Sequence, residues 1–352
     1  MRSVSEQLEL YGLDGARRIA EGASTSPRER SRMLRRVEVT HELMSELPAS
    51  EDLSFLHSGL CQTCLPHSRP ADNNGIWQRK SGRFSLTVQP GVFDPGDGAR
   101  YVGVPYGPKA RLILIHLQTE GMRSRTVNLG ASFSAFMRSL GLAVTGGQRG
   151  TIGAVREQSL RISQCSFTMQ WTSDDAGRRP TVISNTRIVD RLELWSSDRQ
   201  GWTETVELSE QFHAHLREHA VPLDRRGLAH LSSNSLGLDL YALFAYRLPR
   251  LERDLHLRWT TLLEQIGAAE RTTQTLAQRI REVMPDVRTA YPHAQVEVTP
   301  HGLLLKPSPP AVPKTIVPGC RLVETGKAKA GSSSSGNSAG PVSEAGVPTK
   351  SR

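Results

Sequence analysis

The residue pattern with the clearest recognition chemistry is a polar stripe within residues 271–284, RTTQTLAQRIREVM. Its members recur at i, i+3, i+7 and i+10: Arg271, Gln274, Gln278 and Arg281. An apolar ridge runs along the same stretch at helical spacing: Leu276, Ile280, Val283 and Val287. In the DNA major groove arginine pairs with guanine and glutamine with adenine, each pairing discriminating by about 1–3 kcal/mol. The pattern indicates a helix with one face on protein and the other on base edges, although an ordinary solvated face looks the same.

Five further arginines are weaker candidates for contact with DNA. Arg149 precedes a helix expected after Gly150, where helix N-terminal amides attract phosphate. On that helix Arg156 flanks the apolar ridge and Arg161 points away from it. A polar connection between two expected strands holds Arg178 and Arg179. We expect this connection to contact the DNA backbone or the minor groove, and an exposed loop tip explains the same residues equally well.

A CxxC motif, Cys61-Gln-Thr-Cys64, lies between His57 and His67 and has the form of half a zinc site. A closed structural zinc site needs four ligands and usually a second paired motif, and the two other cysteines are single and remote. We therefore interpret the pair as small buried side chains and expect no metal site.

The sequence indicates a binding protein rather than an enzyme. His213-Ala-His215 imitates the His-x-His of metal-dependent nicking enzymes, but residues 208–219 read as a helix, on which residues two apart point to different sides. The glycine-rich segment 145–153 lacks the Gly-Lys-Ser/Thr ending of a nucleotide-binding loop. We expect no catalytic residues and no cofactor.

Composition points to a polyanionic partner. The 352 residues carry 44 Lys and Arg against 35 Asp and Glu, a formal net charge of +9. This favours nucleic acid first and an anionic membrane surface second, while a basic enzyme kept soluble by its charge is the alternative. No apolar run approaches the roughly 20 residues of a membrane span, and residues 1–7 lack a signal core. With four cysteines only, we expect a cytoplasmic protein associated with nucleoid or plasmid.

The first half of the chain suggests one DNA-binding unit behind an N-terminal segment. Residues 1–50 read as two helices, the second from about Pro27 to Leu47, and residues 51–106 as an irregular lead-in with a strand at 83–88. Three helices and two strands follow: 109–122, 132–140, a helix after Gly150, 166–172 and 187–195. Because that is the element order of a winged helix, we assign a first winged-helix domain to residues 107–203.

A similar order recurs in the second half of the chain. Its helices and strands are expected at 235–248, 258–266, 271–284, 295–298 and 303–306. This assigns a second winged-helix domain to residues 204–307, with the polar stripe on its third helix. Proline, glycine and serine dominate residues 308–352, which we predict to be a disordered tail. The predicted fold class is α+β, mainly helical, with two winged-helix domains in tandem, each a helix-turn-helix plus a β-hairpin.

Four sequence blocks resemble plasmid-encoded RepA-type replication initiators. They are FLHSGLCQTCLPHSRP (Phe55–Pro70), VGVPYGPKARLILIHLQTE (Val102–Glu120), GASFSAFMRSLGL (Gly130–Leu142) and RGTIGAVREQSLRISQCSFTM (Arg149–Met169). The likeness runs in order from about Phe55 to Pro307, and residues 1–50 and the tail lie outside it. Cys64 is not part of the family's pattern.

The resemblance implies a protein that binds repeated sequences in the double-stranded DNA of a plasmid origin and helps to open the duplex. It also implies recruitment of the host initiator and the replicative helicase, winged-helix architecture, and a homodimer that represses its own promoter while monomers initiate. It supplies no catalytic residues. A plasmid-encoded transcriptional repressor without initiator activity is the alternative, because both functions need the same DNA-reading part.

Overall fold

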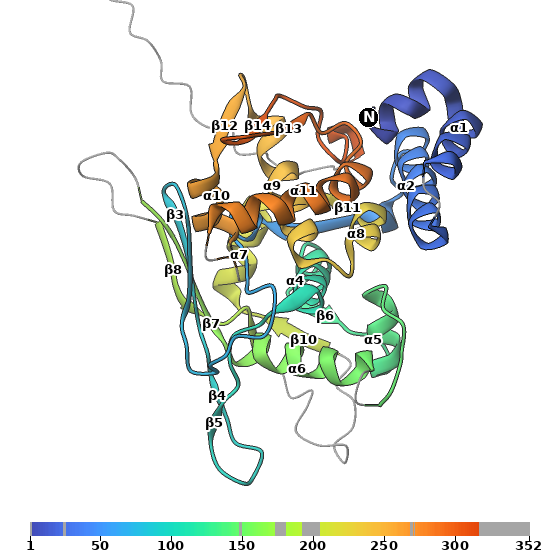
Figure 1. Ribbon diagram of the computed structural model, residues 1–352. Helices are drawn as coiled ribbons and strands as arrows, with labels where there is room; N and C mark the ends of the chain where they lie inside the picture. Colours follow the sequence, from blue (N-terminus) through green and yellow to red (C-terminus); the bar gives the residue numbers. More distant parts are fainter. Residues whose placement is uncertain are drawn as a thin grey trace, which may run out of the picture. The chain divides into compact units, whose positions relative to one another are not determined.

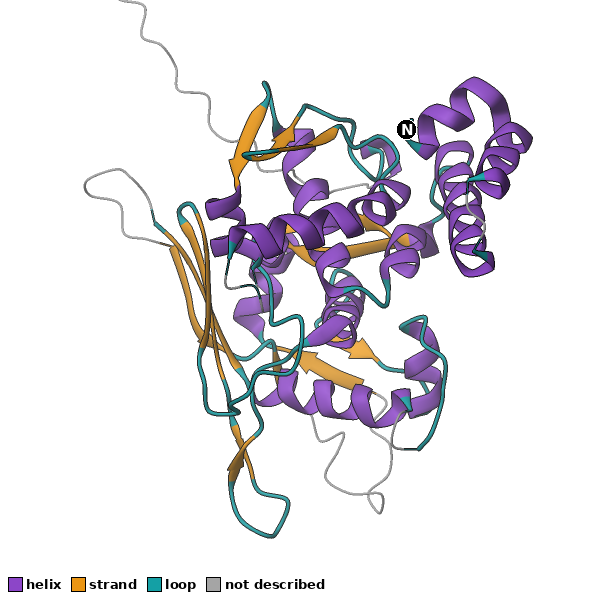
Figure 2. Cartoon of the chain, in the orientation of Figure 1, coloured by secondary structure: helices purple, strands orange, loops and turns teal. Residues whose placement is uncertain are grey.

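The computed structural model describes residues 2–23, 26–147, 150–172, 181–191, 205–267, 270 and 272–316 (Figures 1 and 2). It is a mixed α/β structure with about half of these residues in helices. The two expected N-terminal helices are present as α1 (Val4–Gly22) and α2 (Pro27–Ser45). The Ser3 side chain caps α1 by accepting a hydrogen bond from the amide of Glu6, and Pro27 occupies the first turn of α2.

The α1–α2 hairpin has a small core of its own. That core is formed by Leu8, Ala16, Ala20 and Val37 and is separate from the main hydrophobic core. The hairpin packs through α2 against α8 (Arg225–Leu231) and α11 (Thr273–Ala290), as Figure 1 shows. Charged contacts between α2 and α11 hold it there, with Arg36 donating to Asp286 at 2.6 Å.

The first predicted group of helices is confirmed with small shifts in its limits. Its members are α4 (Gly107–Gly121), α5 (Phe133–Ser139) and α6 (Thr151–Gln164), with the short strand β6 (Thr126–Asn128) between α4 and α5. The inward ridge expected on α6 consists of Ile152, Val155, Ser159 and Ile162. It is also confirmed, because the last three are buried and Ile152 is half-buried against the core. Of the strand expected at 187–195, the described part of the chain shows β9 (Val189–Arg191), and residues 192–195 lie outside that part. β8 (Thr181–Thr186) precedes this range and was not predicted.

The hairpin after α6 belongs to a larger sheet than the sequence predicted. β7 (Ser166–Trp171) pairs with β8 on one side and with β3 (Phe84–Gln89) on the other, and β2 (Trp77–Ser81) completes a four-stranded antiparallel sheet in the order β2-β3-β7-β8. Alternate residues face the core, which buries Phe84, Leu86 and Val88 of β3. A short ribbon, β4 (Val92–Phe93) with β5 (Arg100–Tyr101), follows β3.

Residues 51–106 contain more regular structure than the irregular lead-in predicted for them. β1 (Leu53–His57) pairs antiparallel with the distant β11 (Ala220–Asp224) and continues into α3 (Ser58–Gln62). β1 was not predicted, because both of its faces are largely covered by protein. Its residues therefore do not alternate in polarity. The short 3-10 helix η1 (Ser50–Asp52) precedes it. β10 (Thr205–Leu208) lies between β6 and β9 in a separate three-stranded sheet and is followed by α7 (Glu210–His219).

The second predicted group is present with one strand more than expected. Its elements are α9 (Ser235–Arg247), η2 (Leu248–Arg250), β12 (Leu255–Arg258), α10 (Trp259–Ile266), α11, β13 (Val296–Thr299), β14 (Gly302–Leu305) and η3 (Lys314–Ile316). The three strands form an antiparallel sheet in the order β12-β14-β13. Gly302 permits this pairing, because a Cβ atom there would lie 1.9 Å from the carbonyl oxygen of Leu257.

The predicted end of the stripe helix at Met284 is wrong, since α11 continues through Pro285 to Ala290. Val287 and Ala290 extend the buried ridge along that final part. A proline inside a helix removes one amide hydrogen bond. The helix continues despite that loss, and its final part buries Val287 and Ala290.

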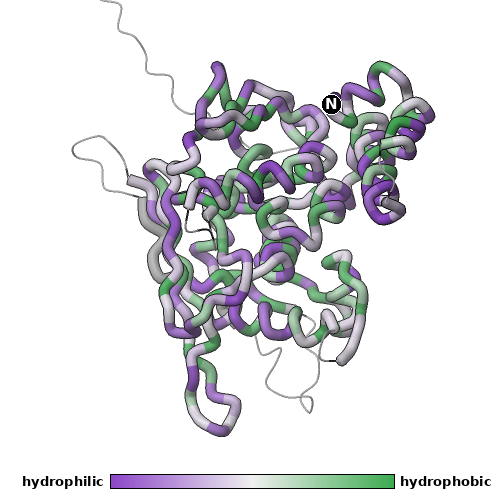
Figure 3. Tube along the Cα trace, in the orientation of Figure 1, coloured by the Kyte–Doolittle hydropathy of each residue, from purple (hydrophilic) through white to green (hydrophobic). Residues whose placement is uncertain are grey.

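One continuous hydrophobic core joins the two predicted domains, reaching from Leu56 to Leu305. α9 lies within it, buried on nearly all sides from Ser235 to Ala245, and appears largely hydrophobic in Figure 3. The proposed boundary at residues 203/204 falls within residues outside the described part and stays a prediction.

A buried ion pair connects α4 to α9 inside this core. Arg111 donates from Nε and from one terminal nitrogen to the two carboxylate oxygens of Asp239, both at 2.7 Å, and the two side chains are 7% and 8% exposed. The guanidinium also donates to the carbonyls of Leu65, Pro66 and Gly107. Burial opposes ionisation of Asp239, but the adjacent Arg111 holds the pKa of this carboxyl below its ordinary value.

We predict that Asp239→Asn destabilises the protein by about 3–5 kcal/mol, because it leaves the buried charge of Arg111 without its counter-ion. Urea unfolding would measure the change in free energy. The double variant Arg111→Met with Asp239→Leu should lose less than Asp239→Asn, since it removes both charges. A single variant within about 1 kcal/mol of wild type would contradict a structural role for the pair.

Candidate nucleic-acid interface

α11 presents the predicted polar stripe to solvent and the predicted ridge to the core. Leu276, Ile280, Val283 and Val287 are buried, which confirms the ridge. Gln274, Gln278 and Arg281 are exposed, while Arg271 lies outside the described residues. Thr272 caps the helix by accepting a hydrogen bond from the amide of Thr275 at 3.3 Å.

The exposed side chains of the stripe make few contacts with the rest of the protein. Gln278 donates to Glu282 at 3.0 Å, and the guanidinium of Arg281 lies 5.7 Å from the ring centroid of Trp259. The side chain of Gln274 has no hydrogen-bond partner in the described part of the chain. Such groups can exchange a weak surface contact for a bidentate contact with a base edge without leaving a buried polar atom unpaired.

The turn that leads into α11 is supported by a residue that sequence reasoning missed. Arg79 of β2 donates to the carbonyl of Gly267, the residue that ends α10, and its guanidinium stacks 3.7 Å from the ring centroid of Trp77. A cation at a helix C-terminus interacts favourably with the helix dipole. Trp77 and Arg79 are two apart on one strand and therefore share a face, but nothing in the sequence indicates that α10 is their neighbour.

The two arginines predicted to contact DNA from α6 differ in their exposure to solvent. Arg156 is exposed, with its guanidinium 5.3 Å from the ring centroid of Phe133. The prediction that Arg161 points away from the apolar ridge and contacts DNA is wrong, because its side chain is only 3% exposed. Arg161 donates to the carbonyl of Val104 at 3.0 Å and to Glu157 at 2.9 Å, so its guanidinium satisfies internal acceptors.

The three remaining arginines predicted as DNA contacts, Arg149, Arg178 and Arg179, lie outside the described residues. Glu157, which shares α6 with Arg156, accepts from Tyr106 as well as from Arg161. This carboxylate is therefore held by the protein rather than left free to repel phosphate.

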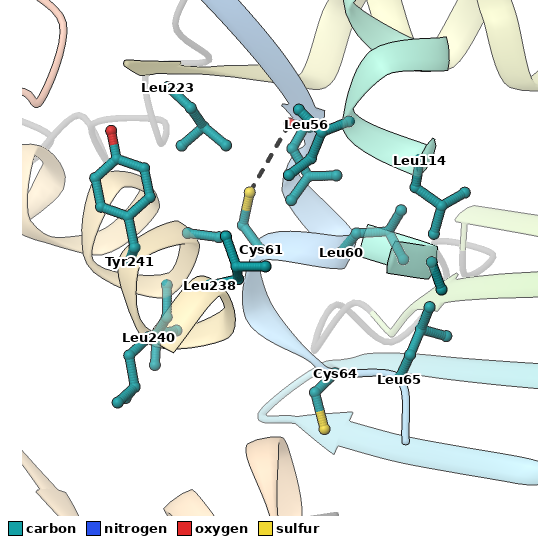
Figure 4. Packing of buried hydrophobic residues seen from close by; sticks show 14 of the residues in the cluster. Leu56, Leu60, Cys61, Cys64, Leu65, Leu114, Leu223, Leu238, Leu240 and Tyr241 are labelled. Carbon is teal, nitrogen blue, oxygen red and sulfur yellow. Dashed lines mark hydrogen bonds between the residues drawn. The ribbon is translucent and has the colours of Figure 1, made fainter. Parts of the chain in front are cut away.

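The two cysteines of the CxxC motif are buried, as the sequence predicted. Burial raises the pKa of both thiols, that of Cys64 to about 12, so both are protonated at neutral pH. Cys61 points toward the carbonyl of Leu56, at 3.8 Å, and away from Cys64 (Figure 4).

A cluster of metal-ligand types, Cys64, His67 and Asp239, does occur, with atoms within 4.8 Å of one another. Both carboxylate oxygens of Asp239 already accept hydrogen bonds from Arg111, and one also contacts His67 Nε2 at 2.8 Å. The cluster therefore serves the buried ion pair described above.

α7 carries the His-x-His pair and is helical as predicted. His215 Nδ1 lies 2.7 Å from His57 Nε2, and His57 Nδ1 accepts a hydrogen bond from the amide of Gly59. A neutral imidazole has one accepting nitrogen, so His57 must donate from Nε2 and His215 must accept. Burial, and then the neighbouring His219, lower the pKa of His215 to about 4. His215 Nδ1 is therefore paired with a histidine outside the His-x-His motif.

Comparison with known families supports the resemblance seen in the sequence. Residues 104–263 match the family model described as plasmid encoded RepA protein. This confirms, over that segment, the likeness to RepA-type replication initiators. The match covers α4 through most of α10 and ends before α11, so the polar stripe and the N-terminal hairpin lie outside it.

Two solved structures are similar to parts of the chain. One, a crystal structure of selenomethionine derivatives of domain 2 and domain 3 of RctB, is 13% identical with a TM-score of 0.41, covering 64% of this chain and 83% of that one. The other, a crystal structure of RctB domains 2-3, is 14% identical with a TM-score of 0.41, covering 70% of this chain and 94% of that one. No curated protein matches the chain.

Within the described residues, no helix combines the length and apolar composition needed to cross a membrane.

We predict that the folded protein loses stability as the pH falls from about 6.5 to about 4, in part through His215. Its pKa is lower in the folded protein than in the unfolded chain. The unfolded chain therefore binds more protons in this window, and stability rises with pH across it. Urea unfolding at several pH values measures the dependence.

The variant His215→Gln should show a smaller loss of stability on acidification than wild type. His116→Gln is a parallel test, because burial also lowers the pKa of that ring to about 4. An acid-induced loss that neither substitution reduces would show that these rings do not control it.

Proposed function

We propose that this protein is a plasmid replication initiator that binds repeated DNA sequences at an origin, promotes opening of the duplex and recruits host replication proteins. The observation that carries the proposal is the match of residues 104–263 to the plasmid encoded RepA family. The net charge of +9 and the exposed polar face of α11 support it independently, because both suit a nucleic-acid partner.

The second half of the chain supports a winged-helix unit. Its elements follow the order α9, β12, α10, α11, β13, β14, and its sheet has the order β12-β14-β13. In this proposal α10 and α11 are the helix-turn-helix, and β13 with β14 is the wing. α11 would then lie in the major groove with Gln274, Gln278 and Arg281 toward the bases.

The first half supports a similar unit with an addition. α4, β6, α5 and α6 stand in the same order, and β6-β10-β9 is a three-stranded sheet whose last strand in sequence lies between the other two, as in β12-β14-β13. The hairpin β7–β8 extends a different sheet and is extra to this scheme. We propose that α6, with Arg156 exposed, is the corresponding DNA-facing helix.

In this proposal the protein acts by binding and performs no covalent chemistry. His215, the second histidine of the His-x-His pair, accepts a hydrogen bond from His57, and His213 lies elsewhere on α7. Duplex opening would instead be driven by binding energy, since bending or untwisting DNA is offset by the added contacts that the deformation allows.

We predict that Gln274→Ala and Gln278→Ala each weaken binding to the origin repeat by about 1–3 kcal/mol and leave binding to random DNA nearly unchanged. The reason is that base contacts specify sequence while phosphate contacts do not. Footprinting on DNA flanking the gene would define the repeat, and titration would give the affinities. Gln89→Ala, an exposed glutamine on β3, is the matched control. Equal losses of affinity for the repeat and for random DNA would show that the two glutamines contact phosphates and not bases.

A plasmid that carries only this gene and its flanking repeats should replicate after transformation of a suitable host, and the same plasmid with Gln274→Ala and Gln278→Ala should be lost. Plasmid copy number provides the measurement. Failure of the wild-type plasmid to replicate, together with intact binding to the repeats, would favour the transcriptional repressor instead.

A further inference from the structure

A basic groove lies between α2 and the turn that joins α8 to α9, with a volume of about 720 Å³. Arg28, Arg32 and Arg35 of α2 line one side, and His230 with Asn234 lines the other. Figure 1 shows α2 beside α8 and the C-terminal half of α11. The groove therefore adjoins the helix to which we assign base recognition.

Asp286 of α11 fixes both sides of the groove. It accepts hydrogen bonds from Arg32 and, at 2.6 Å, from Arg36, while His230 Nε2 lies 3.3 Å away. Burial raises the pKa of a carboxyl group, but the hydrogen bonds from these neighbours hold the pKa of Asp286 below its ordinary value. Because one ionised carboxylate contacts α2 and α8 together, the position of the groove follows that of α11.

The charge of the groove favours an anion. Three arginines line it against two carboxylates, Glu29 and Asp286, and Asp286 is already committed to the contacts above. Arg28 and Arg35 are exposed and have no ion-pair partner among the described residues. The arginine fork suits phosphate oxygens, which it can bind through two nitrogens at once.

His230 adds an unsatisfied group to the same groove. Its side chain is only 5% exposed, and Nδ1 has no hydrogen-bond partner in the described part of the structure. Buried polar atoms are nearly always paired, so an unpaired nitrogen at a cationic groove marks a place for a ligand atom.

We propose that this groove binds backbone phosphates of the same DNA duplex that α11 reads, which makes the α1–α2 hairpin a second DNA contact. The inference rests on the proposed function. A helix in the major groove has a sugar-phosphate strand on each side, and the hairpin, which Asp286 fixes to α11, would contact one of them. Residues 1–50 would then set affinity and orientation without reading sequence.

The test is the salt dependence of DNA binding by the full chain. Arg28→Ala and Arg35→Ala should each lower the slope of log K against log salt concentration by about 0.9, the value for one phosphate contact. Each should weaken binding to the origin repeat and to random DNA by the same factor. Arg28→Lys and Arg35→Lys, which keep the charge, should retain most of the slope.

Arg18→Ala is the matched control, because it removes an exposed arginine of α1 that does not line the groove. Circular dichroism of each variant establishes that the hairpin remains folded. Slopes for Arg28→Ala and Arg35→Ala equal to that of Arg18→Ala would overturn this inference and leave the proposed function intact. Failure of the wild-type chain to bind origin DNA would overturn the proposed function itself.

Discussion

The buried contact between Arg111 and Asp239 is the constraint on which much of the structure depends. A guanidinium and a carboxylate removed from water are stable only when nearly all of their donors and acceptors are satisfied. Here the backbone carbonyls of residues 65, 66 and 107 take the remaining donors, so the loop before α4 must follow one path. The requirement for complete pairing thus fixes a loop, α4 and α9 at once.

The same contact bears on how the two proposed DNA-facing units work together. α4 and α9 are the first helices of those units, and a continuous core surrounds their contact. Arg79 adds a second connection, from the four-stranded sheet to the end of α10. Relative motion of the units would break buried polar contacts as well as apolar packing. In the proposed function, the distance between the two DNA contacts is therefore set by the protein and not by the DNA.

Local periodicity predicted the helices well, because the ridges of α6 and α11 arise from residues three and four apart. It also predicted that Gln274, Gln278 and Arg281 would be exposed. The errors come from contacts between distant residues. Nothing near β1 in the sequence indicates its partner β11, and Arg161 is buried because Val104, on a remote loop, offers a carbonyl to it.

The candidate site was incomplete in the sequence for the same reason. Asp286 is five positions beyond Arg281 and follows Pro285, so it lay past the predicted end of the helix at Met284. Its partners on α2 lie about 250 residues away, and only the folded chain shows that they meet. Arg79 and the groove on α2 were missed likewise, since the residues that define them come from separate elements.

Pro285 divides α11 into two segments, one on each side of a missing backbone hydrogen bond. Pro285 cannot donate to the carbonyl of Arg281, so the helix has one hydrogen bond fewer at that point. Bending of a helix concentrates where such a bond is missing. In the proposed function this point lies between the base-facing side chains and Asp286, so contact with DNA would bend α11 here rather than displace the part that the N-terminal hairpin holds.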